Sequence, residues 1–430
     1  MLRICTAPFL SSSPLRWHIR KANCIRSSDN MANAEVLKKL ADDVQKAVAA
    51  HSQSEDNADY DNALSAIQKL QLAVERPGDF AARVRFQGLQ NAALVMLGEM
   101  GVLQTITANG GKETTSANLA SQTGCNELLI VRLMRMLTAV GICEETGINT
   151  YRSNAMMDVL ASDGQQAGMK YMTDLQFHII SKIRDFMLET QIHTGSAPSL
   201  TACQFAFGKS FWQILDESEE QRANFNEYMK AARRGGQVQL WHERYPPASK
   251  LSDETLKTGQ DAVLMVDVGG GVGGQVGAFR KQYPNLPGRC VLQDLPDTIS
   301  RNQSPPENVE CIAYNFFEPQ PIKGARLYLF RSVCHDWDDG KSRELLSNTV
   351  AAMDPGYSRL LIDEWVLPDS GVNLKAVNMD INMILMFNAI ERTKSQWRNL
   401  LADVGLEIVE IYSTPGAAEC VIETKCKSSQ

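Results

Sequence analysis

The chain has 430 residues, of which 44% are hydrophobic and 22% are charged, and its formal net charge is −7. This length predicts one large domain or two domains with an ample core. The acidic balance argues against a nucleic-acid-binding protein, which needs a basic face. No apolar run approaches the roughly 18 residues that cross a membrane. The ten cysteines form no CxxC pair and no metal-ligand spacing, which argues against zinc and disulfides and favours a reducing, cytoplasmic compartment.

The first 30 residues differ from the rest of the chain. They contain five lysines and arginines and several serines, and no acidic residue precedes Asp29. One interpretation is a mitochondrial transit peptide. The other is an unstructured extension, with Met31 as the real start of the protein. The prediction adopted here is a poorly structured extension over residues 1–33, with a mitochondrial location as the alternative to the cytoplasm.

Apolar residues recur at helical spacing through the first hundred residues. They predict helices over Ala34–Ala50 and Tyr60–Val74, the second ending near Pro77-Gly78, and a largely apolar, buried segment over Val84–Met100 that stops at Gly101. These segments predict a mostly helical start to the folded part of the chain.

Residues 115–151 have the order of a winged helix. Ser116 can cap a short helix, a second helix covers Glu127–Val140, and a hairpin turns at Thr146-Gly147. Winged helices often bind DNA, but the second helix carries only two arginines and no basic arm is present. The pattern therefore favours a module for packing or dimerisation.

From Val263 onward, strands alternate with helix-length segments, which is typical of a mostly parallel, doubly wound sheet. The predicted strands are Val263–Val268, Val291–Gln293, Cys311–Tyr314, Arg326–Phe330, Leu360–Ile362 and Cys420–Glu423. A long helix over Glu217–Arg234 leads into this region. The sequence thus predicts a helical, winged-helix-like domain over residues 34–235 and a Rossmann-like domain over residues 236–430.

The glycine-rich stretch after the first of these strands predicts a nucleotide-cofactor site. Five glycines stand within residues 269–274, where the missing β-carbons allow a sharp turn and close approach of a ligand. A helix follows over Val276–Tyr283. Asp294 comes after the next strand, at the sheet edge where a ribose can be held by its hydroxyls.

Two cofactors fit this stretch. Gly269-x-Gly271-x-x-Gly274 matches the dinucleotide fingerprint, and Asp294 falls 20 residues after Gly274, as that fingerprint expects. Asp267 favours a different cofactor, because its carboxylate would repel a pyrophosphate. The same carboxylate could hold a cationic amine, such as the amino group of S-adenosylmethionine (SAM).

A second stretch with chemical potential follows the strand that ends at Phe330. It reads Arg-Ser-Val-Cys-His-Asp-Trp and places His335 just past a carboxyl strand end, where α/β folds bind ligands. A histidine can act as a general base near neutral pH. Glu364 and Glu391 lie in the same predicted domain. Each of these residues alone is more often an ordinary hydrogen-bonding or surface residue.

Taken together, the motifs resemble those of the SAM-dependent O-methyltransferases of the plant caffeate/flavonoid type, and fungal secondary-metabolite members most of all. The motifs are Asp-Val-Gly-Gly-Gly, Asp294-Leu-Pro, Cys334-His-Asp-Trp, Asp363-Glu-x-x-Leu-Pro and Glu391-Arg-Thr, and the resemblance covers about residues 60–425. It implies a Rossmann-like SAM-binding methyltransferase domain preceded by a winged-helix-like dimerisation domain. It also implies a homodimer, a small hydroxylated aromatic substrate, and neither a metal, a nucleic acid nor a membrane.

The resemblance also implies which residues bind the cofactor. Asp267, Gly269 and Gly271 would surround the methionine portion, and Asp294 would bind the ribose hydroxyls. Asn315 and Phe316 would lie near the adenine, together with Arg331, which stands where plant members commonly have lysine. Phe225 and Met229 would line the cofactor from the connecting helix.

By the same resemblance, His335 would be the catalytic base, flanked and oriented by Glu364 and Glu391. The candidate walls of the substrate pocket are Trp337, Met383, Met386 and Phe387. Methionines and aromatic residues at helical spacing are as often plain core. A base of this kind suits the transfer of a methyl group from a sulfonium to a phenol, whose pKa is ordinarily ~10.

Two other classes of protein remain as alternatives. An NAD(P)-dependent oxidoreductase would account for the glycine fingerprint. A non-catalytic winged-helix regulator that keeps the fold would account for the N-terminal pattern. The set of His335, Glu364 and Glu391 and the acidic net charge argue against the regulator.

Overall fold

The computed structural model describes residues 33–54, 57–192, 200–235, 240–251, 256–414 and 419–427. The extension predicted over residues 1–33 therefore lies almost entirely outside the described residues. The chain divides into two compact units, Met1–Val84 and Arg85–Gln430. The boundary predicted between a helical domain and a Rossmann-like domain falls inside the second unit and stays a prediction.

The first unit is built on a pair of packed helices, α1 (Ala34–His51) and α2 (Asn57–Val74). The Asn33 side chain caps α1 by accepting a hydrogen bond from the Val36 amide at 2.9 Å. No residue of α1 is buried. The next helix, α3 (Pro77–Glu99), starts at the proline that the sequence analysis takes as a helix end. Proline fits the first helical turn, because its missing N–H has no partner there.

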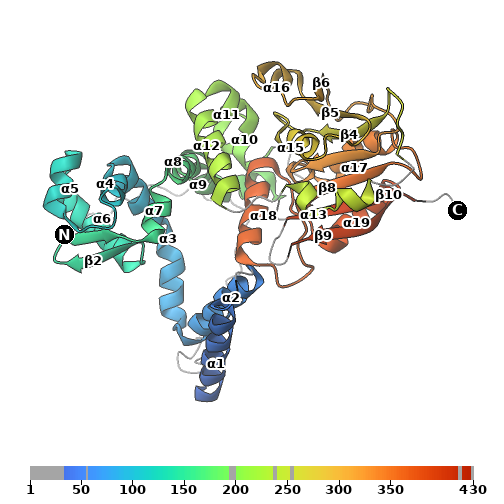
Figure 1. Cartoon of the computed structure of the whole chain (residues 1–430). Helices are drawn as coiled ribbons and strands as arrows, with labels where there is room; N and C mark the ends of the chain where they lie inside the picture. The colour runs from blue at the N-terminus through green and yellow to red at the C-terminus, as the bar shows by residue number, and fades with distance from the viewer. Residues whose placement is uncertain are drawn as a thin grey trace. The chain divides into compact units, whose positions relative to one another are not determined.

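The second unit begins with the helix–helix–hairpin order that the sequence predicts (Figure 1). Its elements are α4 (Val102–Ala108), β1 (Thr114–Thr115), α5 (Ser116–Thr123), α6 (Glu127–Ala139), β2 (Cys143–Gly147) and β3 (Thr150–Ser153). The three strands form an antiparallel sheet in the order β1-β3-β2. The hairpin turns after Gly147, with Asn149 at a φ of 50°, and not at Thr146-Gly147 as predicted.

Further helices connect this module to the larger sheet. They are α7 (Ala155–Leu160), α8 (Asp163–Tyr171), α9 (Phe177–Thr190), α10 (Ala202–Phe207), α11 (Phe211–Glu217) and α12 (Glu219–Gly235). A single π-helical turn, η1 (Met172–Gln176), joins α8 to α9. Helix α12 packs on α8 and corresponds to the long helix predicted before the Rossmann-like region.

The C-terminal part is a seven-stranded sheet in the order β6-β5-β4-β7-β8-β10-β9. Its strands are β4 (Val263–Val268), β5 (Arg289–Asp294), β6 (Val309–Ala313), β7 (Leu327–Arg331), β8 (Arg359–Trp365), β9 (Leu406–Ser413) and β10 (Glu419–Cys426). The first five pair in parallel, and β10 is antiparallel to both neighbours. The mostly parallel, Rossmann-like sheet is thus confirmed, and β9 is a strand that the sequence analysis does not predict.

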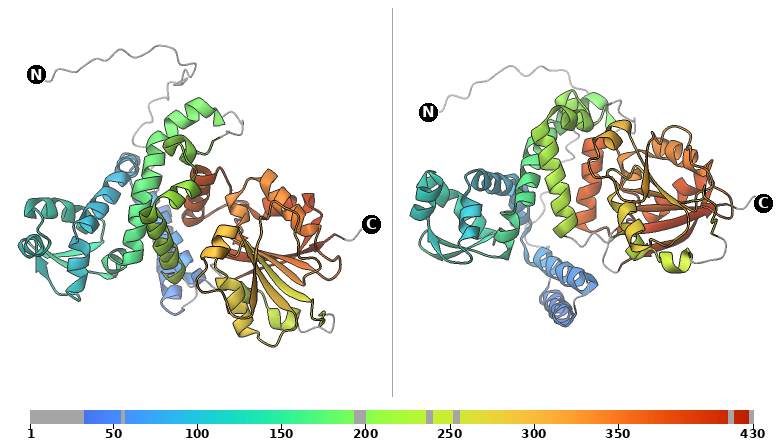
Figure 2. Two further views of the ribbon diagram at one scale, coloured as in Figure 1. Left: turned by 90° about the horizontal axis from the view of Figure 1, so that it is seen from above. Right: turned by 45° about the horizontal axis from the view of Figure 1, so that its top comes forward.

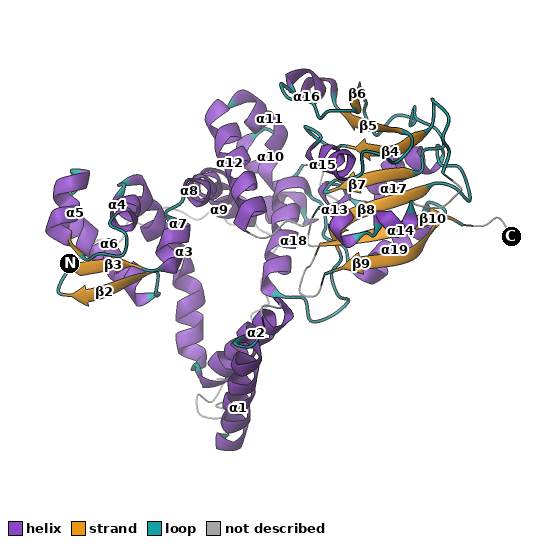
Figure 3. Ribbon diagram, in the orientation of Figure 1, coloured by secondary structure: helices purple, strands orange, loops and turns teal. Residues whose placement is uncertain are grey.

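Helices cover both faces of this sheet (Figures 2 and 3). They are α13 (Trp241–Arg244), α14 (Pro247–Lys250), α15 (Gly274–Gln282), α16 (Pro296–Arg301), α17 (Asp339–Val350) and α19 (Lys394–Asp403). The remaining helix, α18 (Leu374–Phe387), packs against α10. One core contains Leu345 of α17 and Trp397 of α19, and the other contains Trp241 of α13 and Phe279 of α15. With both faces covered, the carboxyl ends of the parallel strands remain as the edge where ligands bind.

Candidate active site

The glycine turn after β4 is held against the end of β5. The amides of Gly269 and Gly270 donate to the Gln293 carbonyl at 2.8 and 3.2 Å. Gly269 and Gly271 take positive φ angles of 72° and 62°, which few residues with a side chain adopt. The Gly271 amide donates to Asp294 Oδ2 at 2.8 Å. The turn and Asp294, predicted from the sequence to share one site, are therefore directly bonded.

Asp267 is a buried carboxylate beneath this turn. Asp267 is 1% exposed. Burial raises the pKa of its carboxyl group to about 7, although the charge of Arg331 acts to lower it. Its Oδ2 atom has no hydrogen-bond partner among the residues that the structure describes. A β-carbon at Gly270 would stand 2.6 Å from the Asp267 carboxyl carbon. A buried carboxylate with one unpartnered oxygen fits the cationic amine of SAM and opposes a pyrophosphate.

Asn315 and Phe316 follow β6, and the Phe316 ring reaches the same turn. A β-carbon at Gly269 would lie 3.6 Å from Cε1 of Phe316, so that ring borders the turn. The Asn315 side chain accepts a hydrogen bond from the Phe317 amide at 3.1 Å and shapes the bend after β6. Phe316 therefore stands near the glycine turn, and the role of both residues beside the adenine stays a prediction.

Arg331, at the end of β7, is engaged by an acid on the next strand. Its Nε atom donates to Asp363 Oδ2 at 2.9 Å, and Arg244 of α13 also binds the Asp363 carboxylate. The Asp363 side chain is 2% exposed. In the sequence, Asp363 stands out only as part of a motif, and Arg244 gives no signal, because α13 lies far from the other site residues along the chain.

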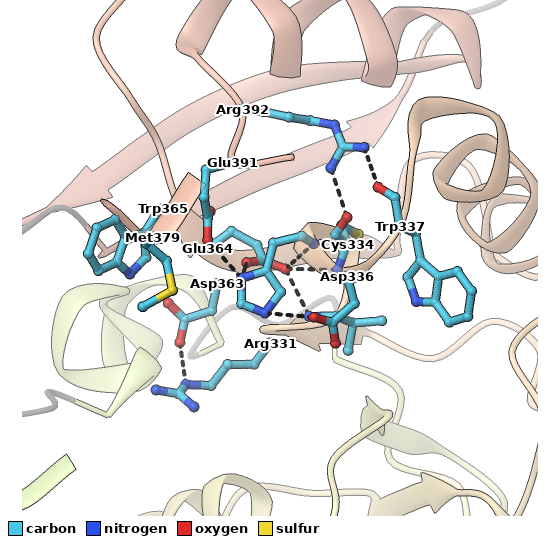
Figure 4. A network of polar contacts seen from close by, with 12 residues as sticks. Arg331, Cys334, Asp336, Trp337, Asp363, Glu364, Trp365, Met379, Glu391 and Arg392 are labelled. Atoms are coloured by element: carbon cyan, nitrogen blue, oxygen red, sulfur yellow. Dashed lines mark hydrogen bonds and ion pairs between the residues drawn. The ribbon is translucent and has the colours of Figure 1, made fainter. Parts of the chain in front are cut away.

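His335 sits on a three-residue 3₁₀ helix, η3 (Cys334–Asp336), directly after β7. Its Nδ1 atom lies 3.0 Å from Glu391 Oε1 and 3.6 Å from Glu364 Oε2 (Figure 4). Glu364 is the sixth residue of β8, and Glu391 lies in the loop between α18 and α19. The three residues that the sequence pointed to thus converge from three separate segments.

Glu364 also holds the backbone of η3. One of its oxygens accepts hydrogen bonds from the amides of Val333 at 2.9 Å and Cys334 at 2.8 Å, with the His335 amide at 3.4 Å. A short helix leaves its first amides without internal partners, and this carboxylate supplies them. Glu391 is the direct partner of the imidazole, whereas Glu364 caps the segment that carries it.

The charges around the imidazole change its proton affinity. Burial alone would lower the pKa of His335, but Glu364, Glu391 and Asp336 outweigh it and raise the pKa to about 10. Burial raises the pKa of Glu364 to about 7 and that of Asp336 to about 6. The Asp336 carboxylate, which the sequence analysis does not consider, lies 3.5 Å from Nε2 of His335.

Ligand atoms of His335, Glu364 and Glu391 all lie within 4.8 Å of one another, a spacing that could hold a metal ion. One oxygen of Glu364 is already bonded to backbone amides, which leaves it fewer free lone pairs for a cation.

The predicted pocket residues fall into two groups. Met383 and Met386 are buried on α18, and the Phe387 ring stacks on Trp212 with centroids 5.7 Å apart. Trp337 instead packs edge-on against Phe317, with centroids 4.8 Å apart. Figure 4 shows Trp337 and Met379 of α18 on opposite sides of the carboxylates of Asp336, Glu364 and Glu391. The structure therefore groups Trp337 with the rings near the glycine turn.

Phe225 and Met229 lie on α12. The Phe225 ring contacts Phe211 and Tyr171, with centroids 5.2 and 5.6 Å away, and Met229 is half-buried. Phe225 shares this hydrophobic cluster with Met386 and Phe387. Contact of these two residues with the cofactor stays a prediction.

The fold and the glycine turn define a Rossmann-like enzyme whose cofactor carries a cationic group. Residues 188–407 match the model of a family described as an O-methyltransferase domain. The methyltransferase cfoC of Aspergillus candidus is 31% identical over 84% of this chain and 89% of its own length. Demethylsterigmatocystin 6-O-methyltransferase of Aspergillus parasiticus is 32% identical over 80% of this chain and 87% of its own length.

Solved structures agree with these relatives. The structure of LepI in complex with SAM is 27% identical and covers 92% of this chain and 100% of its own, with a TM-score of 0.76. The structure of OxaC with sinefungin and meleagrin is 25% identical at the same coverage and TM-score. The chain belongs to the O-methyltransferase domain family, and it is a SAM-dependent O-methyltransferase. The comparisons give no support to an oxidoreductase or a non-catalytic regulator.

Proposed function

We propose that this enzyme methylates a phenolic hydroxyl of a small aromatic secondary metabolite, with His335 as the general base. The observation that carries the proposal is the imidazole whose Nδ1 atom is held 3.0 Å from Glu391 Oε1. Relatives named for methylation of a sterigmatocystin precursor support the acceptor class. The proposal extends their chemistry to this chain.

SAM supplies an electrophilic methyl group when it is bound. Glu391 accepts the Nδ1–H of His335, so that Nε2, which lies 3.5 Å from Asp336 Oδ1, is the nitrogen that takes the proton of the acceptor hydroxyl. The two glutamates then stabilise the imidazolium that forms. Glu364, Glu391 and Asp336 raise the pKa of His335 to about 10, close to that of a phenol at ~10. Only the unprotonated ring can act as the base, so turnover should rise with pH toward that pKa.

For the cofactor, the proposed ligands are the residues around the glycine turn. Asp267 would bind the amino group, Gly269 and Gly271 would admit the methionine portion, and Asp294 would take the ribose hydroxyls. Asn315, Phe316 and Arg331 would border the adenosine, and Phe225 and Met229 would close the site from α12. The pocket for the acceptor would be formed by Met383, Met386 and Phe387, whereas Trp337 would lie on the side of the cofactor.

The test is incubation of the protein with labelled SAM and a panel of hydroxylated aromatic compounds, followed by mass spectrometry of the products. We expect His335→Ala to lower kcat by about 10²- to 10⁴-fold, the usual contribution of a positioned base. Calorimetric titration with S-adenosylhomocysteine should show unchanged affinity. A variant that binds the cofactor and methylates at the wild-type rate would contradict the role of His335.

We also propose that the protein acts as a homodimer in the cytoplasm. The helices of the first unit expose apolar side chains that a second copy could cover, among them Tyr60, Leu64 and Ile67. The eight cysteines within the described residues are free thiols, which fits a reducing compartment. Within the described ranges, no helix is long and apolar enough to cross a membrane.

A further inference from the structure

Arg392 is a buried arginine directly beside Glu391 in the chain. It is 1% exposed, and its guanidinium lies 5.2 Å from the centroid of the Trp397 ring. Nη1 donates to the Cys334 carbonyl at 2.8 Å, and Nη2 donates to the Trp337 carbonyl at 2.9 Å (Figure 4). Nη2 also contacts Ser342 Oγ at 3.0 Å. The arginine therefore binds both carbonyls that flank the His335–Asp336 pair.

The fourth contact of Arg392 ties the same segment to the following helix. Its Nε atom donates to Asp339 Oδ1 at 2.9 Å, at the start of α17. A planar guanidinium with several donors in fixed directions can hold all these acceptors at once, which a lysine ammonium cannot. Because the charge is fully buried, losing any of these acceptors would be costly.

The segment that Arg392 binds has little internal structure to hold it in place. It is a single turn of 3₁₀ helix, which has weak hydrogen-bond geometry. Ser332, just before it, has a φ of 52°, a conformation that is unfavourable for a residue with a side chain. Contacts from outside the segment must therefore keep His335 in its position.

Those contacts come from both ends. Glu364 binds the amides at the start of η3, and Arg392 binds the carbonyls at its end. Glu391 and Arg392 are themselves fixed, since the Glu391 amide donates to Asp380 Oδ1 at 2.9 Å and the Leu367 amide donates to the Arg392 carbonyl at 3.0 Å. One dipeptide thus holds the imidazole ring through Glu391 and the backbone beneath it through Arg392.

We propose that Arg392 is a positioning residue for methyl transfer, which keeps the imidazole of His335 against Glu391 by clamping the carboxyl end of η3. This inference rests on the proposed role of His335 as the base. Without the clamp, η3 relaxes, the imidazole separates from the carboxylates, and the base is both weaker and misaligned. The glycine turn, Asp267 and Asp294 make none of these contacts, so the cofactor keeps its main proposed ligands, and the Trp337 ring is still held by its packing on Phe317.

The experiment compares Arg392→Met and Arg392→Lys with a matched control, Arg326→Met. Arg326 is also buried, at 7% exposed, and also binds two backbone carbonyls, those of Tyr357 and Lys250, but it precedes β7 at the opposite end of that strand. All variants are measured for melting temperature, kcat, S-adenosylhomocysteine affinity and the pH dependence of kcat/KM.

We expect Arg392→Met to lower kcat by about 10- to 100-fold, part of the contribution of a general base, with cofactor affinity unchanged. The rise of kcat/KM with pH should move to lower pH, because the imidazole loses the carboxylates that raise its proton affinity. The kcat and the pH profile of Arg392→Lys should lie between those of the wild type and those of Arg392→Met. Arg326→Met should lower the melting temperature to a similar extent and leave both kcat and the pH profile unchanged.

Three outcomes separate the explanations. A wild-type kcat and pH profile in Arg392→Met would overturn the inference. An equal loss of kcat in Arg326→Met would show that only stability matters and would also overturn it. If Arg392→Met does not fold, Asp339→Ala decides, since it removes one acceptor of Arg392 on a half-exposed side chain. An unchanged pH profile in a folded Asp339→Ala would count against the clamp, whereas a failure of His335→Ala to impair turnover would instead refute the proposed function.

Discussion

At the scale of single residues, Glu391 controls both the direction and the basicity of the imidazole. We expect Glu391→Gln to reduce kcat by at least about tenfold, because the amide is a weaker partner for the developing imidazolium. The carboxylate raises the pKa of His335, so its removal lowers that pKa toward the ordinary value. The free base then forms at lower pH, and the rise of kcat/KM with pH shifts in the same direction.

The matched control for this prediction is Glu423→Gln. Glu423 is equally buried, on β10, but it pairs with Lys250 at 3.1 Å and with the Tyr412 hydroxyl at 2.8 Å. Its loss should leave the pH profile in place. The phenol of the acceptor ionises identically with either variant, so a shift seen only in Glu391→Gln is assigned to His335. An unmoved profile there would refute the assignment.

The sequence could point to Asp267, His335 and Glu391 because each stands in a short motif at a strand end or turn. It could not point to Asp363, Asp336 or Arg392 as functional, since charged residues next to a motif are usually solvated. Their roles depend on burial and on partners distant in sequence, such as Cys334 for Arg392. Only the folded arrangement of β7, β8 and the loop after α18 brings these partners together.

At the scale of elements, α13 and α15 enclose His242 in an aromatic environment. The residue is 3% exposed, and its ring centroid lies 5.4 Å from Trp241, 5.8 Å from Phe279 and 6.0 Å from Tyr283. Burial lowers the pKa of His242, although Gln282 and Glu243 act to raise it. Because α15 begins at the glycine turn, this environment also supports the cofactor site.

The sign of the resulting pH effect follows from linkage. The unfolded chain binds a proton at His242 near the ordinary pKa of ~6.5, whereas the folded chain binds it only at lower pH. The contribution of this residue to stability is therefore present above ~pH 6.5 and is lost as the pH falls below that value. We expect the wild-type melting temperature to fall more between pH 7 and 5 than that of His242→Gln.

Comparison with the variant is needed because other buried groups titrate in the opposite sense. Burial raises the pKa values of Glu364 and Asp267 to about 7, so acidification relieves the cost of burying these carboxylates. Both remain in His242→Gln, and the difference between the two melting curves isolates the histidine. Equal curves would mean that the folded protein accommodates the charged ring.

Elements that are buried along their whole length were predicted from the sequence more accurately than elements that are partly exposed. β4 is buried along its whole length, and its apolar run gave both ends correctly. β9 alternates buried, half-buried and exposed residues at the sheet edge, with two glutamates, and its pattern is too polar to stand out. The start of α3 was missed at Pro77. Proline occurs both just after a helix and in the first turn of the next one, and the sequence around Pro77 does not distinguish the two cases.

At the scale of the whole molecule, the first unit exposes apolar side chains to solvent in the single chain. Tyr60, Leu64 and Ile67 recur at helical spacing on α2 and are 44–48% exposed. An apolar stripe of this kind on a helix pair in water favours burial against another protein surface. A stable interface buries about 1,600 Å² in total, so further residues around this stripe would have to join the contact.

We expect the full chain to elute as a dimer in size-exclusion chromatography with light scattering. Leu64→Glu combined with Ile67→Glu should convert it to a monomer, because each charge would be desolvated in the interface. Val409→Glu is the control, since Val409 is also 43% exposed but lies on the edge strand β9. A dimer that survives the double substitution would place the interface elsewhere, and a monomeric wild type would remove the proposal of a homodimer. If the monomer still binds S-adenosylhomocysteine but no longer methylates, the second copy is needed for the acceptor and not for the cofactor.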